Sequence, residues 1–221
     1  MNICVVSFYT TNYDIGKLIE PINRAYCTQN KYDYKCFYDI PDDLKDRHPA
    51  WCKLYYIDLV LKDDYDYVMW IDADAFFCNH NMKIENWIID DKYLFICRDA
   101  AASFKQWNSY KHLLNSGVMI FKKDDWCHTI LQFILNHKGF VEYYNKETWE
   151  QVGIRKSYKF NHHHFQQNCH IISDLNFNCN TNDFKKYITE GGFILHLTSF
   201  NGKWKAKNID TINQFKKLLN I

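Results

Sequence analysis

The fold of this 221-residue chain is decided by the stretch Tyr67-Val68-Met69-Trp70-Ile71-Asp72-Ala73-Asp74-Ala75-Phe76-Phe77. Its first five residues are continuously apolar or aromatic, which is typical of a strand buried on both faces of a parallel sheet. Two carboxylates follow this strand directly. Because the carboxyl ends of strands face the ligand crevice in open α/β sheets, the stretch predicts an α/β fold with a site at this strand end.

The spacing of the two carboxylates allows them to share one cation. Residues two apart in extended chain point the same way, so Asp72 and Asp74 can converge. Oxygen ligands suit Mn²⁺ or Mg²⁺, and such sites commonly take a substrate phosphate as a further ligand. Since Asp-x-Asp pairs also occur by chance, a plain polar turn that ends the strand stays open as the alternative.

A histidine at the end of a later apolar run offers a third ligand. His196 follows Ile194-Leu195, and a nitrogen ligand beside two carboxylates favours Mn²⁺ over Mg²⁺. The alternative is a core histidine bonded to a backbone carbonyl. The polar segment that follows contains Gly202 and Lys203, as a diphosphate-binding loop requires, although an ordinary surface turn would look the same.

Outward from this site, apolar runs alternate with amphipathic segments. Strands are predicted over 3–8, 34–38, 67–71, 93–97, 117–121 and 193–197, and helices over 14–27, 51–61, 126–135 and 209–219. Asp14 is expected to cap the first of these helices, and Asp124 or Asp125 the third. The alternation predicts one α/β domain over 1–221 with a mostly parallel sheet. Residues 139–159 have the weakest pattern and are expected to form an irregular, lid-like insertion.

Composition and missing motifs exclude several classes of protein. Lysine and arginine number 27 against 26 acidic residues, so no electrostatic drive toward nucleic acid or anionic membrane is expected. The chain has no glycine-rich phosphate loop, no GxSxG elbow and no cysteine pair at zinc spacing near its 162–164 histidine run. It also has no apolar window of 18 residues, so no integral membrane segment is predicted.

Together these segments resemble a nucleotide-sugar glycosyltransferase of the GT-A fold, and most closely glycosyltransferase family 34, which holds α-galactosyl-, mannosyl- and xylosyltransferases. The resemblance is carried by 48–54, 67–76, 115–120, Trp126 and 193–202. It implies a single Rossmann-like domain with a central sheet flanked by helices. A nucleotide-binding half, about 1–77, would end in the Asp-x-Asp motif, and the rest, about 78–221, would bind the donor sugar and the acceptor.

The resemblance implies a transfer of a hexose or pentose from a UDP-sugar to a glycan or another hydroxyl acceptor. Asp72 would contact the donor ribose and the Mn²⁺ ion (or Mg²⁺), which Asp74 and His196 would also bind. Asp99 and Asn115 would face the donor sugar. The other contacts to the nucleotide and its phosphates would come from Val6, Ser7, Phe8, Tyr9, Thr10, Tyr13, Lys53, Ala73, Gly202 and Lys203. The exact sugar, the acceptor and the oligomeric state are left open.

One stretch departs from the related retaining enzymes, which carry an Asp-Gln or Glu-Gln pair near the reacting carbon. The corresponding stretch here is placed at 165–168, where Gln166 and Gln167 offer hydrogen bonds but no carboxylate nucleophile. Retention is expected from the resemblance. An inverting transfer would need a general base, for which Asp99 or a histidine is the candidate.

Two other functions stay open. A sugar-nucleotide hydrolase or nucleotidyltransferase could use the same carboxylates, and a non-catalytic carbohydrate-binding module could use the aromatic residues, which make up 18% of the chain. Aromatic residues in loops near the site are the candidates for stacking on a base or a sugar. They are Tyr9, Tyr13, Phe76, Trp107, Tyr110, Tyr143, Tyr144, Trp149 and Trp204.

The location is predicted from the cysteines and the N-terminus. Nine cysteines without a CxxC pair are expected to be reduced and mostly buried, which is typical of a cytoplasmic protein. Met1 directly precedes the first strand and no signal peptide is seen, so a soluble enzyme is expected rather than the membrane-anchored form common in the family. Only four of the 27 basic residues are arginine, which indicates an A/T-rich genome such as that of a large virus or a bacterium.

Overall fold

Two β-sheets form the frame of the computed structural model, which describes residues 1–98, 114–179, 184–197 and 204–219. The main sheet has the order β2-β1-β3-β6-β5-β7, and a second sheet pairs β4 with β8. The strands are β1 (Ile3–Phe8), β2 (Asp33–Phe37), β3 (Tyr67–Ile71), β4 (Ala75–Phe77), β5 (Leu94–Arg98), β6 (Leu114–Lys122), β7 (Cys169–Ile172) and β8 (Ile194–His196). In the main sheet only β6 runs against its neighbours. The predicted α/β fold with a mostly parallel sheet is therefore confirmed.

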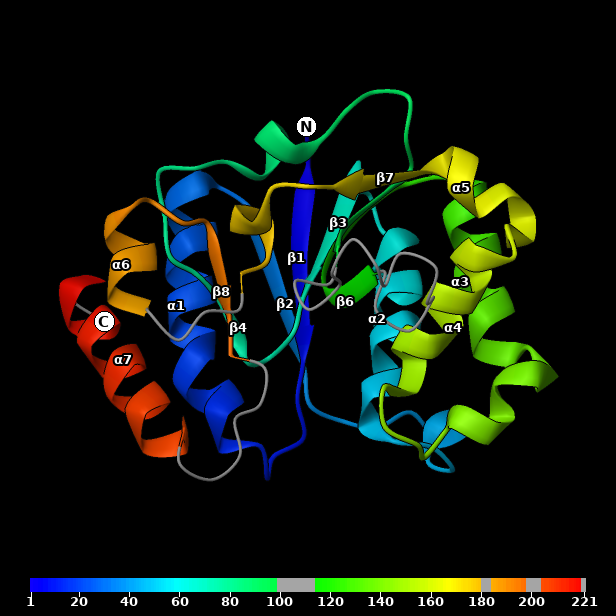
Figure 1. Cartoon of the computed structure of the whole chain (residues 1–221), viewed down its shortest axis with the longest axis horizontal. Coiled ribbons are helices and arrows are strands. Elements are labelled where there is room, and N and C mark those ends of the chain that lie inside the picture. Colours follow the sequence, from blue (N-terminus) through cyan, green and yellow to red (C-terminus); the bar gives the residue numbers. More distant parts are fainter. Residues whose placement is uncertain (99–113, 180–183, 198–203, 220–221) are drawn as a thin grey trace, which may run out of the picture.

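Helices cover both faces of the main sheet (Figure 1). On one side lie α2, α3 and α4, and on the other lie α1, α6 and α7 beyond the small sheet. Their bounds are α1 (Asp14–Asn30), α2 (Cys52–Leu61), α3 (Asp125–Asn136), α4 (Trp149–Lys159), α5 (Phe165–Asn168), α6 (Phe184–Thr189) and α7 (Trp204–Leu219). Short 3₁₀ turns lie at Asp42–Leu44, Pro49–Trp51, Ile84–Trp87, Lys138–Tyr143, His162–His164 and Leu175–Phe177.

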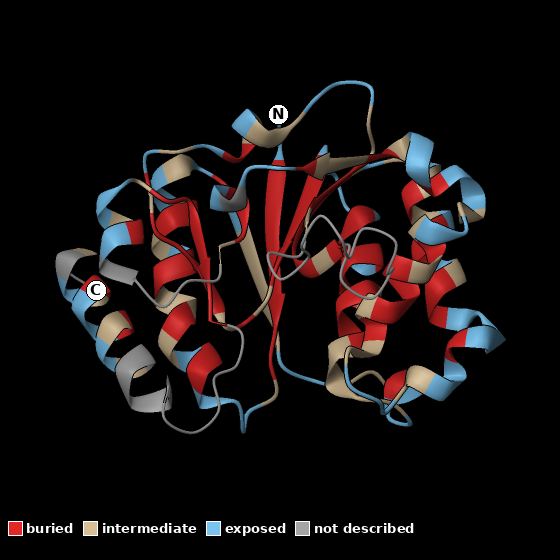
Figure 2. Ribbon diagram, in the orientation of Figure 1, coloured by how far each residue is buried: buried red, intermediate tan, exposed pale blue. Residues whose placement is uncertain are grey.

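The alternation of side chains along β1 divides the core into two. Cys4 and Val6 pack with α2 and α3, whereas Ile3 and Val5 pack toward α1 and the small sheet, because successive side chains of a strand point to opposite faces. Figure 2 shows the central strands β1 and β3 buried along their length, whereas the edge strand β2 is only half-buried. Both cores hold large aromatic side chains, such as Trp70 at 2% exposure, and each fully buried one contributes about 1.5–3 kcal/mol of transfer free energy.

One of the two predicted helix caps is observed. The Asp124 carboxylate accepts a hydrogen bond of 2.8 Å from the backbone N–H of Trp126 and so caps α3. The predicted Asp14 cap is wrong, because Asp14 is already inside α1 and pairs instead with Lys17 at 3.1 Å. A carboxylate in the first turn still interacts favourably with the positive end of the helix dipole.

The region 139–159, expected to be an irregular lid, is mostly ordered as a 3₁₀ turn and helix α4. That expectation was wrong because α4 has few apolar residues to reveal its helical period: its buried residues include Glu150 and Arg155. The helix packs closely instead through Gly153, where an added Cβ would lie 2.5 Å from Ile134 Cγ2. The late strand predicted at 193–197 exists as β8, but it pairs with β4 rather than joining the main sheet.

The order of strands fixes where a ligand can bind. From β1 the chain moves to β2 on one side and then to β3 on the other, and all three strands are parallel. Ligand crevices form at such a reversal, at the carboxyl ends of the two strands that flank it. The loop after β1 and the Asp72–Asp74 turn after β3 therefore lie together at one edge of the sheet.

Candidate active site

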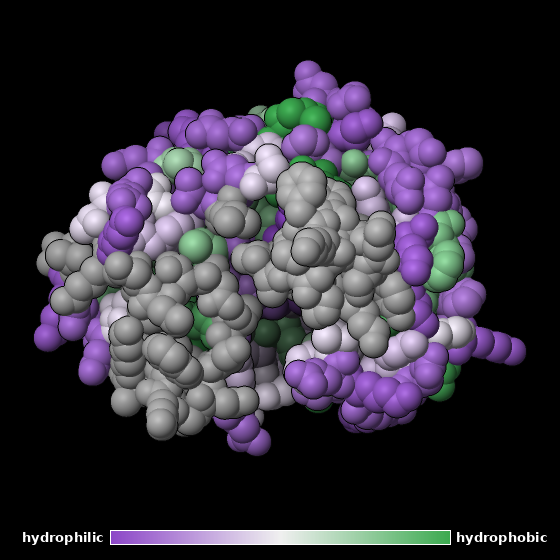
Figure 3. Space-filling view, in the orientation of Figure 1, coloured by the Kyte–Doolittle hydropathy of each residue, from purple (hydrophilic) through white to green (hydrophobic). Residues whose placement is uncertain are grey.

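A cleft of about 600 Å³ lies at this edge, within the size range of small-molecule sites. It is bordered by the loop after β1, the turn after β3, the start of β6, the first turns of α2 and α4, and β8. Figure 3, in the orientation of Figure 1, shows that the molecular surface is hollowed near the centre of the view. The predicted site residues that line the cleft are Phe8, Tyr9, Thr10, Tyr13, Lys53, Asp72, Ala73, Asp74, Asn115 and His196.

Other predicted site residues lie elsewhere. Val6 and Ser7 are buried in β1, beneath the cleft rather than in its lining. Asp99, Gly202 and Lys203 fall outside the residues that the structure describes. Gln166 and Gln167 lie on α5, which precedes β7 and so lies at the opposite, amino-terminal edge of the sheet. There the Gln166 side chain donates to the Tyr158 carbonyl at 2.9 Å.

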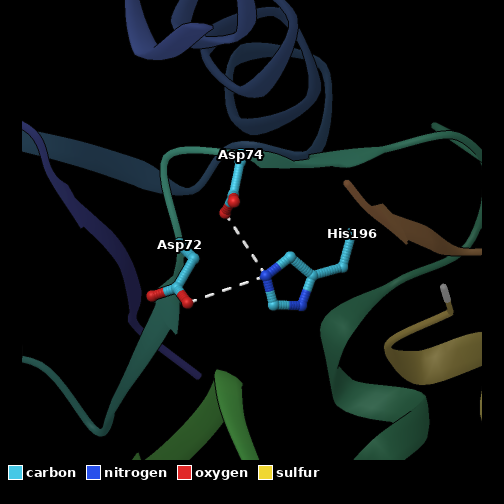
Figure 4. A group of neighbouring side chains, drawn as sticks. All are labelled: Asp72, Asp74 and His196. Atoms are coloured by element: carbon cyan, nitrogen blue, oxygen red, sulfur yellow. Dashed lines mark ion pairs between the residues drawn. The ribbon is translucent and has the colours of Figure 1, made fainter. Parts of the chain in front are cut away.

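Asp72, Asp74 and His196 converge as the sequence predicted (Figure 4). One ligand atom of each lies within 4.8 Å of the other two. The His196 Nε2 atom lies 3.3 Å from Asp74 Oδ1 and 3.7 Å from Asp72 Oδ2. Two carboxylate oxygens and an imidazole nitrogen at this separation form a donor set that suits Mn²⁺.

Strand register builds this cluster. The Asp72 N–H continues the β3–β6 ladder by donating to the Gly117 carbonyl at 2.8 Å, and a tight turn then leads into β4. Because β4 and β8 pair in the register Ala75 to His196, the imidazole lies opposite the residue after Asp74. The Leu197 N–H donates to the Asp74 carbonyl at 2.8 Å and closes this pairing.

Each carboxylate has one oxygen held by the protein. Asp72 Oδ1 accepts from Trp70 Nε1 at 2.7 Å and pairs with the Lys53 ammonium at 2.9 Å. Asp74 Oδ2 accepts from the Tyr13 hydroxyl at 3.3 Å. The remaining oxygens, Asp72 Oδ2 and Asp74 Oδ1, face His196, so the protein orients them toward one point.

The other imidazole nitrogen of His196 is held as well. Its Nδ1 lies 3.0 Å from Asn178 Oδ1, and the Asn178 amide donates in turn to Asn115 Oδ1 at 3.0 Å. Since an amide oxygen only accepts, Nδ1 carries the proton of the neutral ring and the Nε2 lone pair faces the carboxylates. Gly117 makes room for this ring, because a Cβ there would lie 2.0 Å from His196 Cε1.

Without a cation, the cluster satisfies itself as an ion pair. Burial disfavours the charged form of His196, but the nearby Asp74 and Asp72 outweigh it and raise the His196 pKa. Burial likewise opposes ionisation of Asp74, but the attraction of His196 prevails and lowers the Asp74 pKa. A metal ion would take the place of the imidazole proton, so metal binding here would release a proton.

Lys53 is held in a buried network beside the metal cluster. Only 4% exposed, its ammonium lies 2.7 Å from Glu150 Oε1 and 3.0 Å from the Ser116 carbonyl, in addition to the pair with Asp72. Burial opposes its charge, but Asp72 and Glu150 outweigh that effect and raise the Lys53 pKa. Three carboxylates (Asp72, Asp74 and Glu150) against one ammonium leave two net negative charges, which one divalent cation would balance.

The network reveals a pair that the sequence interpretation missed. Glu150 and Gln151 are adjacent, both line the cleft, and Gln151 Oε1 accepts from the Ser116 N–H at 2.8 Å. This is the kind of Glu-Gln pair that the resemblance implies near the reacting carbon, and it lies in the cleft where Gln166 and Gln167 do not. The sequence contains Glu150 and Gln151 side by side, but residues 139–159 were predicted to form an irregular insertion.

The aromatic candidates divide between cleft and core. Tyr9, Tyr13 and Trp149 line the cleft. Phe76 is wholly buried in β4, and Tyr143 and Tyr144 pack against the core on the α2–α3 side. Trp107 and Tyr110, and the side chain of Trp204, lie outside the described parts of the chain.

A mostly parallel sheet that presents an Asp-x-Asp turn after β3 and a histidine on β8 has the architecture of a GT-A glycosyltransferase. Three solved structures share this fold. A glycosyltransferase involved in the glycosylation of the major capsid of PBCV-1 superimposes with a TM-score of 0.70, at 13% identity over 97% of this chain and 100% of that one. The galactosyltransferase LgtC, solved with donor and acceptor sugar analogs, gives 0.63, at 11% identity over 98% and 95%.

GlyE of Streptococcus pneumoniae TIGR4 gives a TM-score of 0.60 at 14% identity, with all of this chain spanning 63% of GlyE. At these identities the likeness shows the fold alone. No protein-family model matches the sequence, and no curated protein matches it either. Membership of family 34 therefore stays a prediction.

Two general expectations can also be compared with the structure. None of the nine cysteines forms a disulfide, and seven of them are buried, in agreement with the expected mostly buried thiols. Among the described helices, none has the length and apolar character needed to cross a membrane.

Proposed function

We propose that this chain is a metal-dependent glycosyltransferase that moves a hexose or pentose from a nucleoside-diphosphate sugar, with UDP as the nucleotide, to a glycan or another hydroxyl acceptor. The observation that carries the proposal is the convergence of Asp72, Asp74 and His196 at the carboxyl edge of a GT-A sheet. The PBCV-1 capsid enzyme and LgtC, which share the fold, support the same class of reaction.

Mn²⁺ fits the residues present, with Mg²⁺ as the alternative. The two free carboxylate oxygens and the His196 Nε2 atom supply a mixed oxygen and nitrogen set, and the cluster has two negative charges to balance. When bound there, the cation would act as a Lewis acid on the departing diphosphate.

The charges of the cleft support a metal-dependent donor site. Its described lining has the carboxylates Asp72, Asp74, Glu147 and Glu150 but only one ammonium, that of Lys53. The Lys53 ammonium already pairs with Asp72 and Glu150, so these two carboxylates offset its positive charge and it attracts a diphosphate only weakly. A diphosphate would meet net repulsion in this lining until a divalent cation is present. Lys203, which lies outside the described residues, remains a predicted contact to the diphosphate.

The nucleoside is proposed to lie against the loop after β1. Tyr13 is 38% exposed beside Asp74, so its ring can stack on a base while its hydroxyl holds the carboxylate. Tyr9 and Thr10 border the same end of the cleft. The described cleft is walled by both proposed halves of the domain: 8–13, 48–53 and 70–74 come from the nucleotide-binding half, and 115–117, 147–151 and His196 from the rest.

We further propose that the transfer retains the anomeric configuration. A covalent route would need a carboxylate free to attack at the reacting carbon, whereas Glu150, the carboxylate of the Glu-Gln pair, is 3% exposed and bonded to Lys53 and Ser116. This favours a front-face route in which the leaving diphosphate takes the proton of the acceptor. Assignment of the product's anomeric configuration by NMR tests the claim, and inversion would refute it.

Product analysis tests the function itself. The enzyme is incubated with UDP-galactose, UDP-glucose, UDP-xylose and GDP-mannose, with Mn²⁺ or EDTA, and with or without a glycan mixture. A glycosyltransferase gives acceptor-dependent nucleotide release and a glycosylated product, both abolished by EDTA. Free sugar at the same rate without an acceptor would indicate a hydrolase. Glycan binding that EDTA leaves unchanged, with no turnover, would indicate a carbohydrate-binding module.

The free thiols support a reducing compartment, so we propose a cytoplasmic location. The fold is shared with the PBCV-1 capsid enzyme and with GlyE of Streptococcus pneumoniae, so it is compatible with both predicted origins, a large virus and a bacterium.

A further inference from the structure

The end of the cleft away from Tyr13 is bordered by a stacked pair of rings that the proposed donor site does not use. The His48 and Trp149 rings lie 4.0 Å apart, centroid to centroid, with their planes 8° from parallel. Both side chains are half-buried, and both line the cleft. We call this pair the ring platform.

A chain of contacts places the ring platform across the metal cluster from the nucleotide loop. Tyr13 contacts Asp74, and the cluster then leads through Asp72 to Lys53. Lys53 pairs with Glu150, whose neighbour in sequence is Trp149 of the ring platform. Tyr13 lies at the start of α1, whereas the ring platform lies at the starts of α2 and α4, which cover the opposite face of the main sheet (Figure 1).

The backbone that presents Trp149 is strained. Thr148 has a φ of 76° and Trp149 a φ of 34°, which is the left-handed region that favours glycine. Strain of this kind persists where the surrounding structure imposes it, and it concentrates at ligand-binding sites. Here it begins α4 with the indole against His48, at the border of the cleft.

The chemistry of the platform suits an uncharged ring with a hydroxylated edge. His48 Nδ1 accepts a hydrogen bond of 3.2 Å from the Ala50 N–H, so the neutral ring carries its proton on Nε2. Burial lowers the His48 pKa and keeps that ring uncharged. Pro49 and Ala50 add apolar surface beside it. A pyranose offers C–H faces for the rings and hydroxyls for one N–H donor.

We propose that the ring platform is the acceptor subsite and that it binds a pyranose ring of a glycan by stacking. This rests on the proposed function, because the donor occupies the Tyr13 end of the cleft. A nucleobase could also stack on such rings, but the proposed nucleoside site is the loop after β1, at the Tyr13 end of the cleft.

Saturation-transfer NMR tests the proposal with methyl pyranosides of galactose, glucose, mannose, xylose and rhamnose, in the presence of UDP and Mg²⁺. The wild type is expected to saturate the ring C–H protons of at least one glycoside. Trp149→Ala should reduce that signal at least fivefold, whereas Trp149→Phe should keep most of it. Phe160→Ala removes an aromatic ring that is 59% exposed, follows α4 and does not line the cleft, so it is the matched control.

UDP binding with Mg²⁺ is measured on the same samples by calorimetry. If Trp149→Ala keeps nucleotide affinity and loses glycoside contact, the platform binds a pyranose outside the nucleotide site, as the proposed acceptor subsite requires. If it loses nucleotide affinity while Phe160→Ala keeps it, or if no glycoside contacts the wild type, the proposal is overturned. Absence of UDP binding in the wild type would refute the proposed donor site instead, so the two failures are distinguishable.

Discussion

The Nε2 atom of His196 lies 3.3 Å from the Oδ1 atom of Asp74, although the two residues are 122 positions apart in the sequence. Pairing of β4 with β8 creates this proximity, because it sets His196 opposite Ala75. The small sheet thus completes the candidate metal site. Predictions about that site can therefore be made residue by residue.

Replacing Asp74 with Asn should remove metal binding and leave the fold intact. The variant loses a charged ligand but keeps a side chain of nearly the same shape, so it should also keep the hydrogen bond from Tyr13. Mn²⁺ affinity, followed by electron paramagnetic resonance, is expected to fall more than about 100-fold. This loss exceeds the roughly 10–100-fold loss that is typical when a residue hydrogen-bonded to a metal ligand is replaced. Asp91→Asn, an exposed carboxylate that does not line the cleft, is the control. Equal Mn²⁺ affinity in the Asp74 variant and wild type would rule out this site.

Asn178 should act by positioning His196. Asn178→Ala removes the acceptor that holds the Nδ1 proton, so the Nε2 lone pair is no longer fixed toward the carboxylates. Mn²⁺ affinity is expected to drop about 10–100-fold, while Asn176→Ala, at an exposed position, leaves it unchanged. The ¹⁵N shifts of the His196 ring report the tautomer directly. Unaltered shifts and affinity in Asn178→Ala would contradict the positioning role.

Gly117→Ala should displace His196. The new methyl group would lie 2.0 Å from Cε1 of the ring, so either the strand or the imidazole must move. Overpacking of this kind costs about 1–3 kcal/mol of unfolding free energy, and Mn²⁺ affinity should fall with it. Gly139→Ala, where the closest contact is His137 at 2.9 Å on the surface, should change Mn²⁺ affinity little. Normal metal binding in Gly117→Ala would show that the ring does not need this space.

Lys53 and Glu150 should be energetically coupled. Lys53→Met leaves the Glu150 carboxylate buried without its partner, which costs about 3–5 kcal/mol of stability. Adding Glu150→Gln removes that unpaired charge, so the double variant should recover much of the lost stability in urea unfolding. Additive losses in the double-mutant cycle would contradict the coupling.

The fall in stability at acid pH should depend on Asp58, which joins α2 to α3 and does not line the cleft. Burial opposes its ionisation, but bonds from His128, Lys62 and Gln132 outweigh it and lower the Asp58 pKa. A carboxylate with a lowered folded-state pKa stabilises the protein above its unfolded value of about 3.9. That stability is lost as the pH falls through the folded-state pKa. Asp58→Asn should therefore make the unfolding free energy less dependent on pH below about pH 5, and an unchanged slope would contradict this.

Local signals predicted much of this molecule. The strand predicted at 67–71 has the same bounds as β3. Its continuous apolar run is typical of a strand with helices or other elements packed on both faces of the sheet. The convergence of Asp72 and Asp74 was predicted for extended chain, but the structure reaches it through a tight turn, in which the Ala75 N–H donates to the Asp72 carbonyl at 2.9 Å. His196 was found because it ends another apolar run, but its pairing with β4 was not foreseen, since β4 is only three residues long.

The rest of the site depends on contacts between distant segments. Glu150 is buried because Lys53 and Ser116 satisfy it, and no sequence window contains all three residues. The polar content of α4 hid its helical period, so the Glu150-Gln151 pair was overlooked in favour of Gln166 and Gln167. The stacking of His48 on Trp149 likewise joins the start of α2 to the start of α4.

Thermal unfolding of the wild type with UDP, with Mn²⁺ and with both tests the central claim most directly. A ligand that binds only the folded state stabilises it by mass action, by about 2.7 kcal/mol at 100 times its dissociation constant. The proposed site predicts a large rise in melting temperature with UDP and Mn²⁺ together and only a small rise with UDP in EDTA. In Asp74→Asn, UDP with Mn²⁺ should raise the melting temperature no more than UDP in EDTA does. An equal UDP shift in EDTA, or no response to any nucleoside diphosphate with Mn²⁺, would contradict a metal-dependent donor site.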